Sequence, residues 1–112
     1  MRGMEHFPDF VTGLTEAALP FENARGWFVT GDGRQVAFIE FTEAVDVPAH
    51  SHREQWEFVL TGSVRLSVEG EVSEYQPGDN FFIPAGAVHS ARVSAGYRAL
   101  IVFNEPDRYA AR

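Results

Sequence analysis

The sequence contains no cysteine, so it forms neither disulfide bonds nor metal sites built from thiolates. Any metal ion would have to be held by nitrogen and oxygen atoms. The absence of cysteine also fits a reducing compartment, and we expect a cytoplasmic protein. Long apolar runs are missing as well: nothing approaches the roughly 18 residues of a membrane span, and the stretch MRGMEHFPDF lacks the apolar segment of a signal peptide.

Lysine is also absent, since all nine basic residues are arginines, and these are dispersed along the chain. The net charge at neutral pH is −7. A nucleic-acid-binding protein needs a basic stripe, and an anionic membrane repels an acidic surface. We therefore expect neither a nucleic-acid partner nor a membrane partner.

What the chain does contain is typical of a globular protein. Its 112 residues are 45% hydrophobic and 22% charged, enough for one core and too little for two, so we expect a single domain over residues 1–112. Ten phenylalanines are many for this length. They indicate large flat surfaces in the core or an aromatic-lined cavity.

Glycine and proline interrupt the chain at short intervals, and the segments between them are rich in Val, Ile and Phe, as strands are. The turn GDG at 31–33 predicts a hairpin, and Glu69-Gly70 predicts another turn. One turn of helix is expected within 9–19, before Pro20. Short strands at this spacing are typical of an all-β sandwich or barrel. The predicted strands cover residues 27–30, 35–41, 56–60, 64–68, 72–75, 81–84, 89–93 and 97–103.

Two histidines, His50 and His52, stand one residue apart, and side chains two apart in a strand point to the same face. Both imidazoles would then reach into one space. Taken alone, such a pair is as consistent with a surface coincidence as with a metal site. A third histidine, His89, follows the segment PGDNFFIPAGAV (77–88), whose two turns can present it from a neighbouring strand.

These two segments resemble the two motifs of the cupin superfamily of small β-barrels. The second motif is matched at the family's spacing by Gly78, Pro84, Gly86 and His89, whereas Val93 stands in place of the closing asparagine. The departure affects a strand edge rather than a metal ligand.

The first motif is matched by His50, His52 and Gly62, with Ala44 in place of its opening glycine. The string HSHxxQW followed by VLxG, with NEPDRY near the C-terminus, is similar to a group of small single-domain bacterial cupins. The resemblance implies an all-β, double-stranded β-helix or jelly-roll barrel, with its core over about 27–104 and a short N-terminal helical turn.

The resemblance also implies a metal-dependent enzyme that acts on a small oxygenated molecule, carrying a carbonyl or carboxylate group or derived from a sugar. Isomerase, lyase and dioxygenase chemistry are the types it suggests. The alternative is a non-catalytic cupin module that binds or senses a small molecule. In both cases the partner is a small molecule.

The oxygen ligand of the first motif has two candidates. Counting forward from His52 selects Glu57, whereas counting back from Gly62 selects Gln55. The strand 56–60 contains no breaker, so the count from Gly62 is the better anchor and predicts Gln55. Glu57 would lie one pleat further along, facing the interior, as a catalytic base, a competing ligand or a group that orients a ligand; the alternative is an exposed strand carboxylate.

We predict one divalent transition-metal ion bound by His50, His52, Gln55 and His89. The alternative for Gln55 is a hydrogen bond to nearby backbone. Imidazole and amide ligands are neutral, so a bound divalent ion would keep its full charge and act as a strong Lewis acid. Nitrogen and oxygen ligands suit Zn, Ni, Fe, Mn or Cu.

Several aromatic residues are candidates for the wall of a substrate pocket, although each is equally a candidate for core packing. They are Phe38, Phe82, Tyr97 and Phe103. Arg92 and Arg98 are candidates for holding an anionic substrate, against the alternative that both are surface residues.

Trp56 and Phe58 alternate with the predicted inward-facing residues and therefore lie on the outer face of their strand. An apolar outer face indicates a second sheet or a subunit contact, and we expect a homodimer. The polar segment 104–112 is expected to be a loosely packed end or an arm exchanged between subunits.

Overall fold

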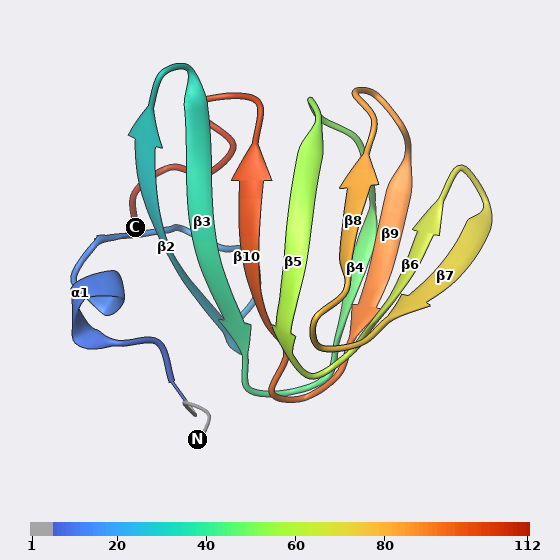
Figure 1. The fold of residues 1–112 in the computed structure, drawn as a ribbon, viewed down its shortest axis with the longest axis horizontal. Coiled ribbons are helices and arrows are strands. Elements are labelled where there is room, and N and C mark those ends of the chain that lie inside the picture. The colour runs from blue at the N-terminus through green and yellow to red at the C-terminus, as the bar shows by residue number, and fades with distance from the viewer. Residues whose placement is uncertain (1–5) are drawn as a thin grey trace.

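The computed structural model describes residues 6–112 and contains two antiparallel sheets and one short helix (Figure 1). The all-β architecture expected from the sequence is confirmed. No helix within the described range has the length and hydropathy needed to cross a membrane. The elements in chain order are α1 (Asp9–Thr12), β1 (Thr15–Glu16), β2 (Ala24–Gly31), β3 (Arg34–Phe41), β4 (Val45–His50), β5 (Gln55–Thr61), β6 (Val64–Val68), β7 (Glu71–Tyr75), β8 (Asn80–Ile83), β9 (His89–Val93) and β10 (Arg98–Phe103).

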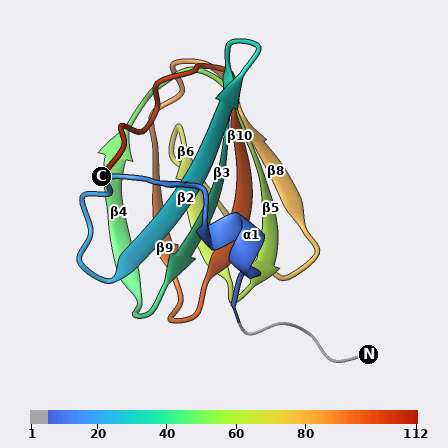
Figure 2. The same cartoon turned by 90° about the vertical axis from the view of Figure 1, so that its left-hand side faces the viewer.

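The two sheets face each other across the interior, as Figure 2 shows from the side. The six-stranded sheet has the order β1-β2-β3-β10-β5-β8, and the four-stranded sheet has the order β4-β9-β6-β7. Consecutive strands such as β4 and β5, or β8 and β9, belong to different sheets, so the chain crosses repeatedly from one to the other, as it does in a jelly roll. This topology makes β4 and β9 neighbours and brings the two histidine-bearing segments together.

The predicted turns form the ends of two hairpins. Asp32 and Gly33, between β2 and β3, have φ angles of 53° and 72°; Glu69 and Gly70, between β6 and β7, have φ angles of 49° and 84°. Two consecutive positive φ values match the right-handed twist of the paired strands, which is why Asp-Gly and Glu-Gly occur at these places. Both turn predictions are confirmed.

The sequence did not reveal β4, which carries His50. This strand contains Pro48, which cannot donate a ladder hydrogen bond, and its pairing with β9 shifts register between Val47 and His50. Proline is tolerated there because β4 lies at the edge of the four-stranded sheet. The turn of helix expected within 9–19 is confirmed as α1, which is followed by Thr15–Glu16, paired with β2 as β1.

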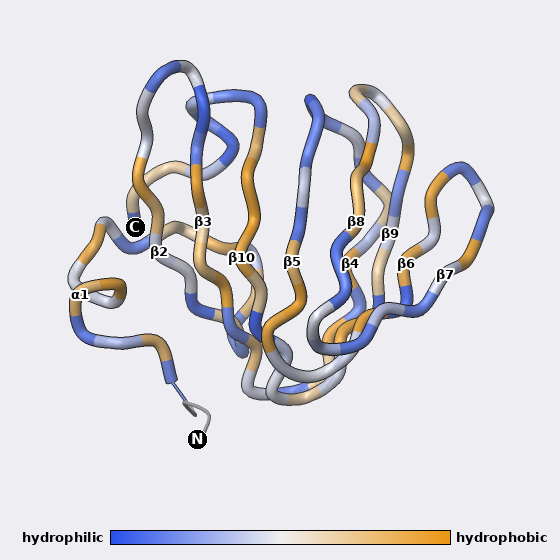
Figure 3. The backbone as a smooth tube through the Cα atoms, in the orientation of Figure 1, coloured by the Kyte–Doolittle hydropathy of each residue, from blue (hydrophilic) through white to orange (hydrophobic). Residues whose placement is uncertain are grey.

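Burial alternates along β5 as the register from Gly62 predicts. Gln55, Glu57 and Val59 face the interior, whereas Trp56 and Leu60 are each 37% exposed on the outer face. The neighbouring strand β10 is hydrophobic along much of its length (Figure 3), and its inward side chains belong to the main core between the sheets. The interior between the sheets is therefore largely apolar, and β5 places two polar side chains in it.

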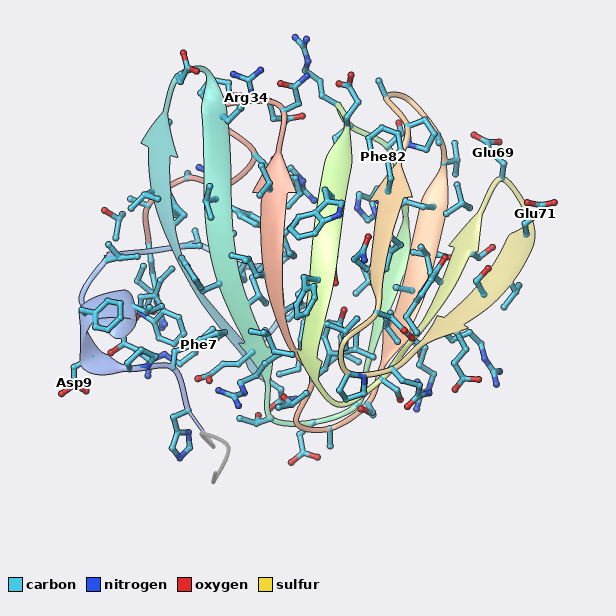
Figure 4. The ribbon with its side chains drawn as sticks, in the orientation of Figure 1. Phe7, Asp9, Arg34, Glu69, Glu71 and Phe82 are labelled. Carbon is cyan, nitrogen blue, oxygen red and sulfur yellow. The ribbon has the colours of Figure 1, made fainter. Side chains whose placement is uncertain are left out.

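A second apolar cluster covers the outer face of β2 and β3 beside α1. It contains Phe7, Val11 and Trp27, with Phe38 packed against it. The ring of Phe7, labelled in Figure 4, lies edge-on to that of Phe38 at 5.7 Å between centroids. Helix α1 therefore seals the outside of the barrel rather than its cavity.

The C-terminal segment folds back onto its own chain, in contrast to the loose end or exchanged arm expected from the sequence. Gln35, fully buried on β3, donates to the carbonyl oxygen of Tyr109 at 3.0 Å and accepts the Tyr109 N–H at 2.9 Å. The N–H of Ala18 donates to the carbonyl oxygen of Ala110 at 2.8 Å. Figure 1 shows this segment returning from the end of β10 towards β2.

Candidate metal centre and cavity

Three imidazoles meet where β4 ends and β9 begins. His50 is the cross-strand partner of His89, and His52 follows in the loop that leads to β5. The ring centroids lie 4.2 Å apart for His50 and His89, 4.8 Å for His52 and His89, and 5.2 Å for His50 and His52. One nitrogen from each ring lies within 4.8 Å of the other two, an arrangement able to hold one metal ion.

The backbone fixes the same tautomer in all three rings. Each Nδ1 lies within hydrogen-bond distance of a backbone carbonyl oxygen: His50 with Pro48 at 2.8 Å, His52 with Arg53 at 2.7 Å, and His89 with Ala87 at 2.9 Å. A carbonyl oxygen only accepts, so each Nδ1 carries the proton and each Nε2 keeps its lone pair. Metal-binding histidines are commonly oriented by such bonds.

The Nε2 of His52 is buried and has no hydrogen-bond partner within residues 6–112. An unsatisfied buried nitrogen costs about 1–3 kcal/mol, a cost that a bound ion would remove. Burial lowers the pKa of His52 and of His89, and their backbone hydrogen bonds offset this only in part. Both rings are therefore neutral near pH 7, which is the form that binds metal, so the donor set fits a divalent transition-metal ion.

Contacts from two other segments hold the loop around His52. The N–H of Gly86 donates to the carbonyl oxygen of His52 at 2.8 Å, and Gly86 has a φ of 77°, which glycine adopts without steric cost. On the other side of the loop, the N–H of Arg53 donates to the carboxylate of Glu105 at 2.9 Å. A glycine of the second motif thus positions a histidine of the first.

The histidines form part of the wall of a cavity of about 510 Å³ between the sheets. Aliphatic and aromatic side chains make up most of this wall. The other ionisable side chains in it are Glu57, Tyr97, Glu105, Arg108 and Tyr109. An apolar cavity with a few convergent polar groups is typical of a small-molecule site.

Glu57 is buried in this wall and has a hydrogen bond to each carboxylate oxygen. Gln55 Nε2 donates to its Oε1 at 2.6 Å, and the Tyr97 hydroxyl donates to its Oε2. Burial raises the pKa of Glu57 to about 7, although both hydrogen bonds act to lower it. Burial and the adjacent carboxylate raise the pKa of Tyr97, so its phenol stays protonated. A carboxyl group that titrates near neutral pH in a cavity is able to exchange a proton with a ligand.

Gln55 lies beside Glu57 and is 7% exposed. Because its amide nitrogen donates to Glu57, its amide oxygen is directed away from that carboxylate, and no hydrogen bond to this oxygen occurs within residues 6–112. In the same described range, the cluster of side chains close enough together to hold one metal ion consists of the three histidines and includes no carboxylate.

A sequence model described as Cupin domain matches residues 38–103, which is more than half of the chain. This chain belongs to the cupin family. The match runs from β3 to β10 and includes all three clustered histidines, so the resemblance seen in the two motifs is confirmed. No curated protein matches this cupin in sequence.

Solved structures share the fold of this cupin at low sequence identity. KdgF from Halomonas sp. has a TM-score of 0.71 and 20% identity, with 82% of this chain and 86% of that chain covered. An RmlC-like cupin from Shewanella frigidimarina has a TM-score of 0.74 and 24% identity, with 96% of both chains covered. Oxalate decarboxylase from Bacillus subtilis, a protein with Mn(II) centres, has a TM-score of 0.73 and 17% identity; 87% of this chain is covered, but only 29% of that chain.

The structure separates the four aromatic residues predicted for the pocket wall. Tyr97 and Phe103 line the cavity. Phe38 instead packs against the outer cluster beside α1, and Phe82, on the outer face of β8 (Figure 4), is 60% exposed. Successive side chains along β3 and β8 point to opposite faces of the sheet. Ile39 points inward, so its neighbour Phe38 points outward, and Phe82 points outward in the same way. Both outward residues are therefore removed from the cavity wall.

The arginine in the cavity is not one of the two considered from the sequence. Arg92 forms an ion pair with Asp46 at 2.9 Å, and Arg98 lies over the ring of Phe7, outside the barrel. Arg108 lines the cavity instead. It was missed because the segment that carries it was expected to be loose.

Proposed function

We propose that this cupin is a metal-dependent enzyme acting on a small oxygenated substrate, either a carbonyl or carboxylate compound or one derived from a sugar. The observation that carries the proposal is Glu57, a buried carboxyl group placed in the same cavity as the three clustered histidines. Burying a carboxyl group costs stability, and a barrel with a purely structural role has no need of one in its cavity. Such costly groups are concentrated at functional sites.

The ion would be held by the Nε2 atoms of His50, His52 and His89 and, in this proposal, by the Oε1 atom of Gln55. The fixed tautomers and the unpartnered Nε2 of His52 support the three imidazole ligands of this set. Zn, Ni, Fe and Mn suit such ligands. When bound, an ion of this kind supplies Lewis acidity, which polarises a substrate oxygen.

Glu57 is the proposed general acid–base. With its pKa near 7, both its protonated and its ionised forms are populated at neutral pH. The donors from Gln55 and Tyr97 hold the carboxyl group in one orientation, so a proton is taken up or released at Oε1 or Oε2. Tyr97 and Phe103 would contact the body of the substrate from the cavity wall.

One observation favours the alternative of a non-catalytic binding module. Both oxygens of Glu57 accept hydrogen bonds, from Gln55 and from Tyr97, and a carboxyl group held in this way is also able to serve a purely structural role in shaping the cavity. In a binding module, Glu57 would position its neighbours without exchanging a proton.

Turnover measurements distinguish the two functions. Metal-loaded wild-type protein and Glu57→Gln would be assayed against small 2-oxo acids, 2-hydroxy acids and uronic acids, with metal content measured in parallel. For an enzyme, we expect turnover of at least one class and a loss of about 100-fold or more in Glu57→Gln at unchanged metal content. Ligand binding without turnover, unaffected by this substitution, would instead favour the binding module.

We also propose that this cupin forms a homodimer through the outer face of β5 and β8. Trp56, Leu60 and Phe82 are exposed there by 37%, 37% and 60%. β8 is also an edge strand of the six-stranded sheet. Light scattering coupled to size-exclusion chromatography should give twice the chain mass for the wild type and the single-chain mass for Phe82→Glu. A wild type that elutes as a monomer at all concentrations would refute the dimer.

A further inference from the structure

Arg108 is the one arginine among the described residues that line the cavity, and the chain contains no lysine. Its guanidinium group lies 4.9 Å from the ring centroid of Tyr109 and 5.7 Å from that of Phe103. A planar guanidinium packed against two aromatic rings is held in a defined position. The fold-back of the C-terminal segment therefore places a fixed positive charge at the cavity.

This charge has no partner of opposite sign within residues 6–112. The ion pairs in that range are formed by Arg25, Arg34, Arg92 and Arg112. Glu105, the nearest acidic residue of the cavity wall in sequence, accepts the N–H of Arg53. The Nε of Arg108 is buried and makes no hydrogen bond to the described residues. A buried guanidinium N–H without an acceptor is destabilising, and a bound acceptor would remove the cost.

The electrostatics of the cavity favour an anionic acceptor. Arg108 and the three histidines line the same cavity, so the guanidinium group and the imidazoles face one space. A divalent ion at the imidazoles would add further positive charge.

We propose that Arg108 is a specificity-determining residue that binds the carboxylate group of a small organic acid in this cavity. The proposal rests on the proposed function, since the acid would be the substrate of the same site. A guanidinium group offers parallel N–H donors that match the two oxygens of a carboxylate. The rest of the acid would lie against the apolar wall beside Phe103.

A matched pair of ligands isolates the carboxylate. Mandelate and mandelamide have nearly the same shape, but only mandelate carries the anionic group. Isothermal titration calorimetry on the full chain should give an affinity for mandelate at least about tenfold higher than for mandelamide. Arg108→Gln should reduce this preference to about one, and Arg108→Lys should retain part of it because the charge is kept. Arg92→Gln, which removes an exposed arginine paired with Asp46 outside the cavity, should leave the preference unchanged.

Two further readouts separate this proposal from the metal-dependent function. Arg108→Gln should retain the wild-type metal content and circular dichroism spectrum, because Arg108 is not a proposed ligand. A protein without metal or turnover that still prefers mandelate through Arg108 would contradict the enzyme function and leave the role of Arg108 standing. Equal affinity of wild-type protein for both ligands, or undiminished mandelate preference in Arg108→Gln, would overturn the role of Arg108.

Discussion

Each imidazole of the metal centre is oriented by a backbone carbonyl that lies one or two residues away in sequence. The local backbone shape therefore sets the direction of every Nε2, and no side chain has to reach in to do so. Arg53 can consequently be replaced without loss of the ring orientation, because it offers only its carbonyl oxygen to His52. The charge of Glu57, by contrast, depends first on burial, which raises its pKa, and then on the side-chain donors Tyr97 and Gln55, which lower it.

Glu57 should make the stability of the metal-free protein depend on pH. Its pKa is raised from 4.5 to about 7, so the folded chain retains a proton that the unfolded chain has released. This contribution is fully present below pH 4.5 and is lost as the pH rises through about 7. Relative to Glu57→Gln, wild-type protein should lose on the order of 3 kcal/mol in the free energy of unfolding across that interval. Urea denaturation at a series of pH values measures the difference.

Glu74→Gln, which removes an exposed carboxylate from β7, is the matched control and should track the wild type throughout. If wild type and Glu57→Gln change in parallel between pH 4.5 and 8, the carboxyl group of Glu57 does not titrate as described.

Tyr97→Phe replaces one uncharged side chain with another and should still affect the carboxyl group of Glu57. The substitution removes the hydroxyl that donates to Glu57 Oε2 and leaves a buried oxygen without its donor. We expect a loss of about 1–3 kcal/mol at pH 8 and a further rise in the pKa of Glu57. Denaturation at pH 5 and pH 8 tests both effects, and a loss that is larger at pH 5 than at pH 8 would argue against them.

At the scale of elements, the turn after β5 is a constraint on the register of that strand. Gly62 has a φ of 73°, and a Cβ atom there would lie 2.8 Å from the Cα of Tyr97 and 2.8 Å from Ser94 Oγ. The close approach brings the start of β10 against β5 and so supports the Tyr97–Glu57 contact. Gly62 therefore has a structural role in addition to matching the first motif.

Gly62→Ala should destabilise the protein by about 2–4 kcal/mol, since it combines an unfavourable φ with a clash against backbone. Gly31→Ala is the control, because no atom lies within 4 Å of a Cβ at that position. Thermal unfolding of both variants measures the difference. Equal melting temperatures for the two would show that the turn is free to move.

The C-terminal segment depends on one buried side chain of β3. The amide group of Gln35 makes hydrogen bonds to Tyr109 in both directions and a third, at 3.3 Å, to the carbonyl oxygen of Pro106. Gln35→Ala should therefore release the segment that carries Arg108, with a loss of about 2–4 kcal/mol. Hydrogen exchange of the backbone amides in 104–112 should accelerate in this variant and not in Gln76→Ala, which changes an exposed glutamine. Unchanged hydrogen exchange of these amides in Gln35→Ala would show that Gln35 does not hold the C-terminal segment.

At the scale of the whole molecule, the fold followed from features that are local in sequence. Turn residues such as Asp32-Gly33 and the alternation along β5 predicted an all-β sandwich or barrel, and the resemblance of the two motifs to the cupin superfamily implied a jelly roll with three clustered histidines. His50 pairs with His89 because β4 and β9 are neighbours in the four-stranded sheet.

The features that sequence reasoning missed arise from long-range contacts. β4 was not predicted because it contains Pro48, and proline argues against a central strand. An edge strand such as β4 tolerates it. Phe38 and Phe82 were predicted to line the pocket from their aromatic side chains alone, which do not reveal which face of a strand points inward. The place of Arg108 at the cavity could not be predicted, because the segment that carries it is held by Gln35, more than 70 residues earlier in the chain.

The metal content of purified and reconstituted protein, measured by inductively coupled plasma mass spectrometry, tests the central claim most directly. We predict a stoichiometric amount of one divalent transition metal in the wild type and in Glu57→Ala, none in His89→Ala, and an affinity lowered by about 10–100-fold in Gln55→Ala. A wild type that holds no metal after reconstitution would contradict the metal centre itself. A site that is emptied by Glu57→Ala and unaffected by Gln55→Ala would contradict the proposed ligand set.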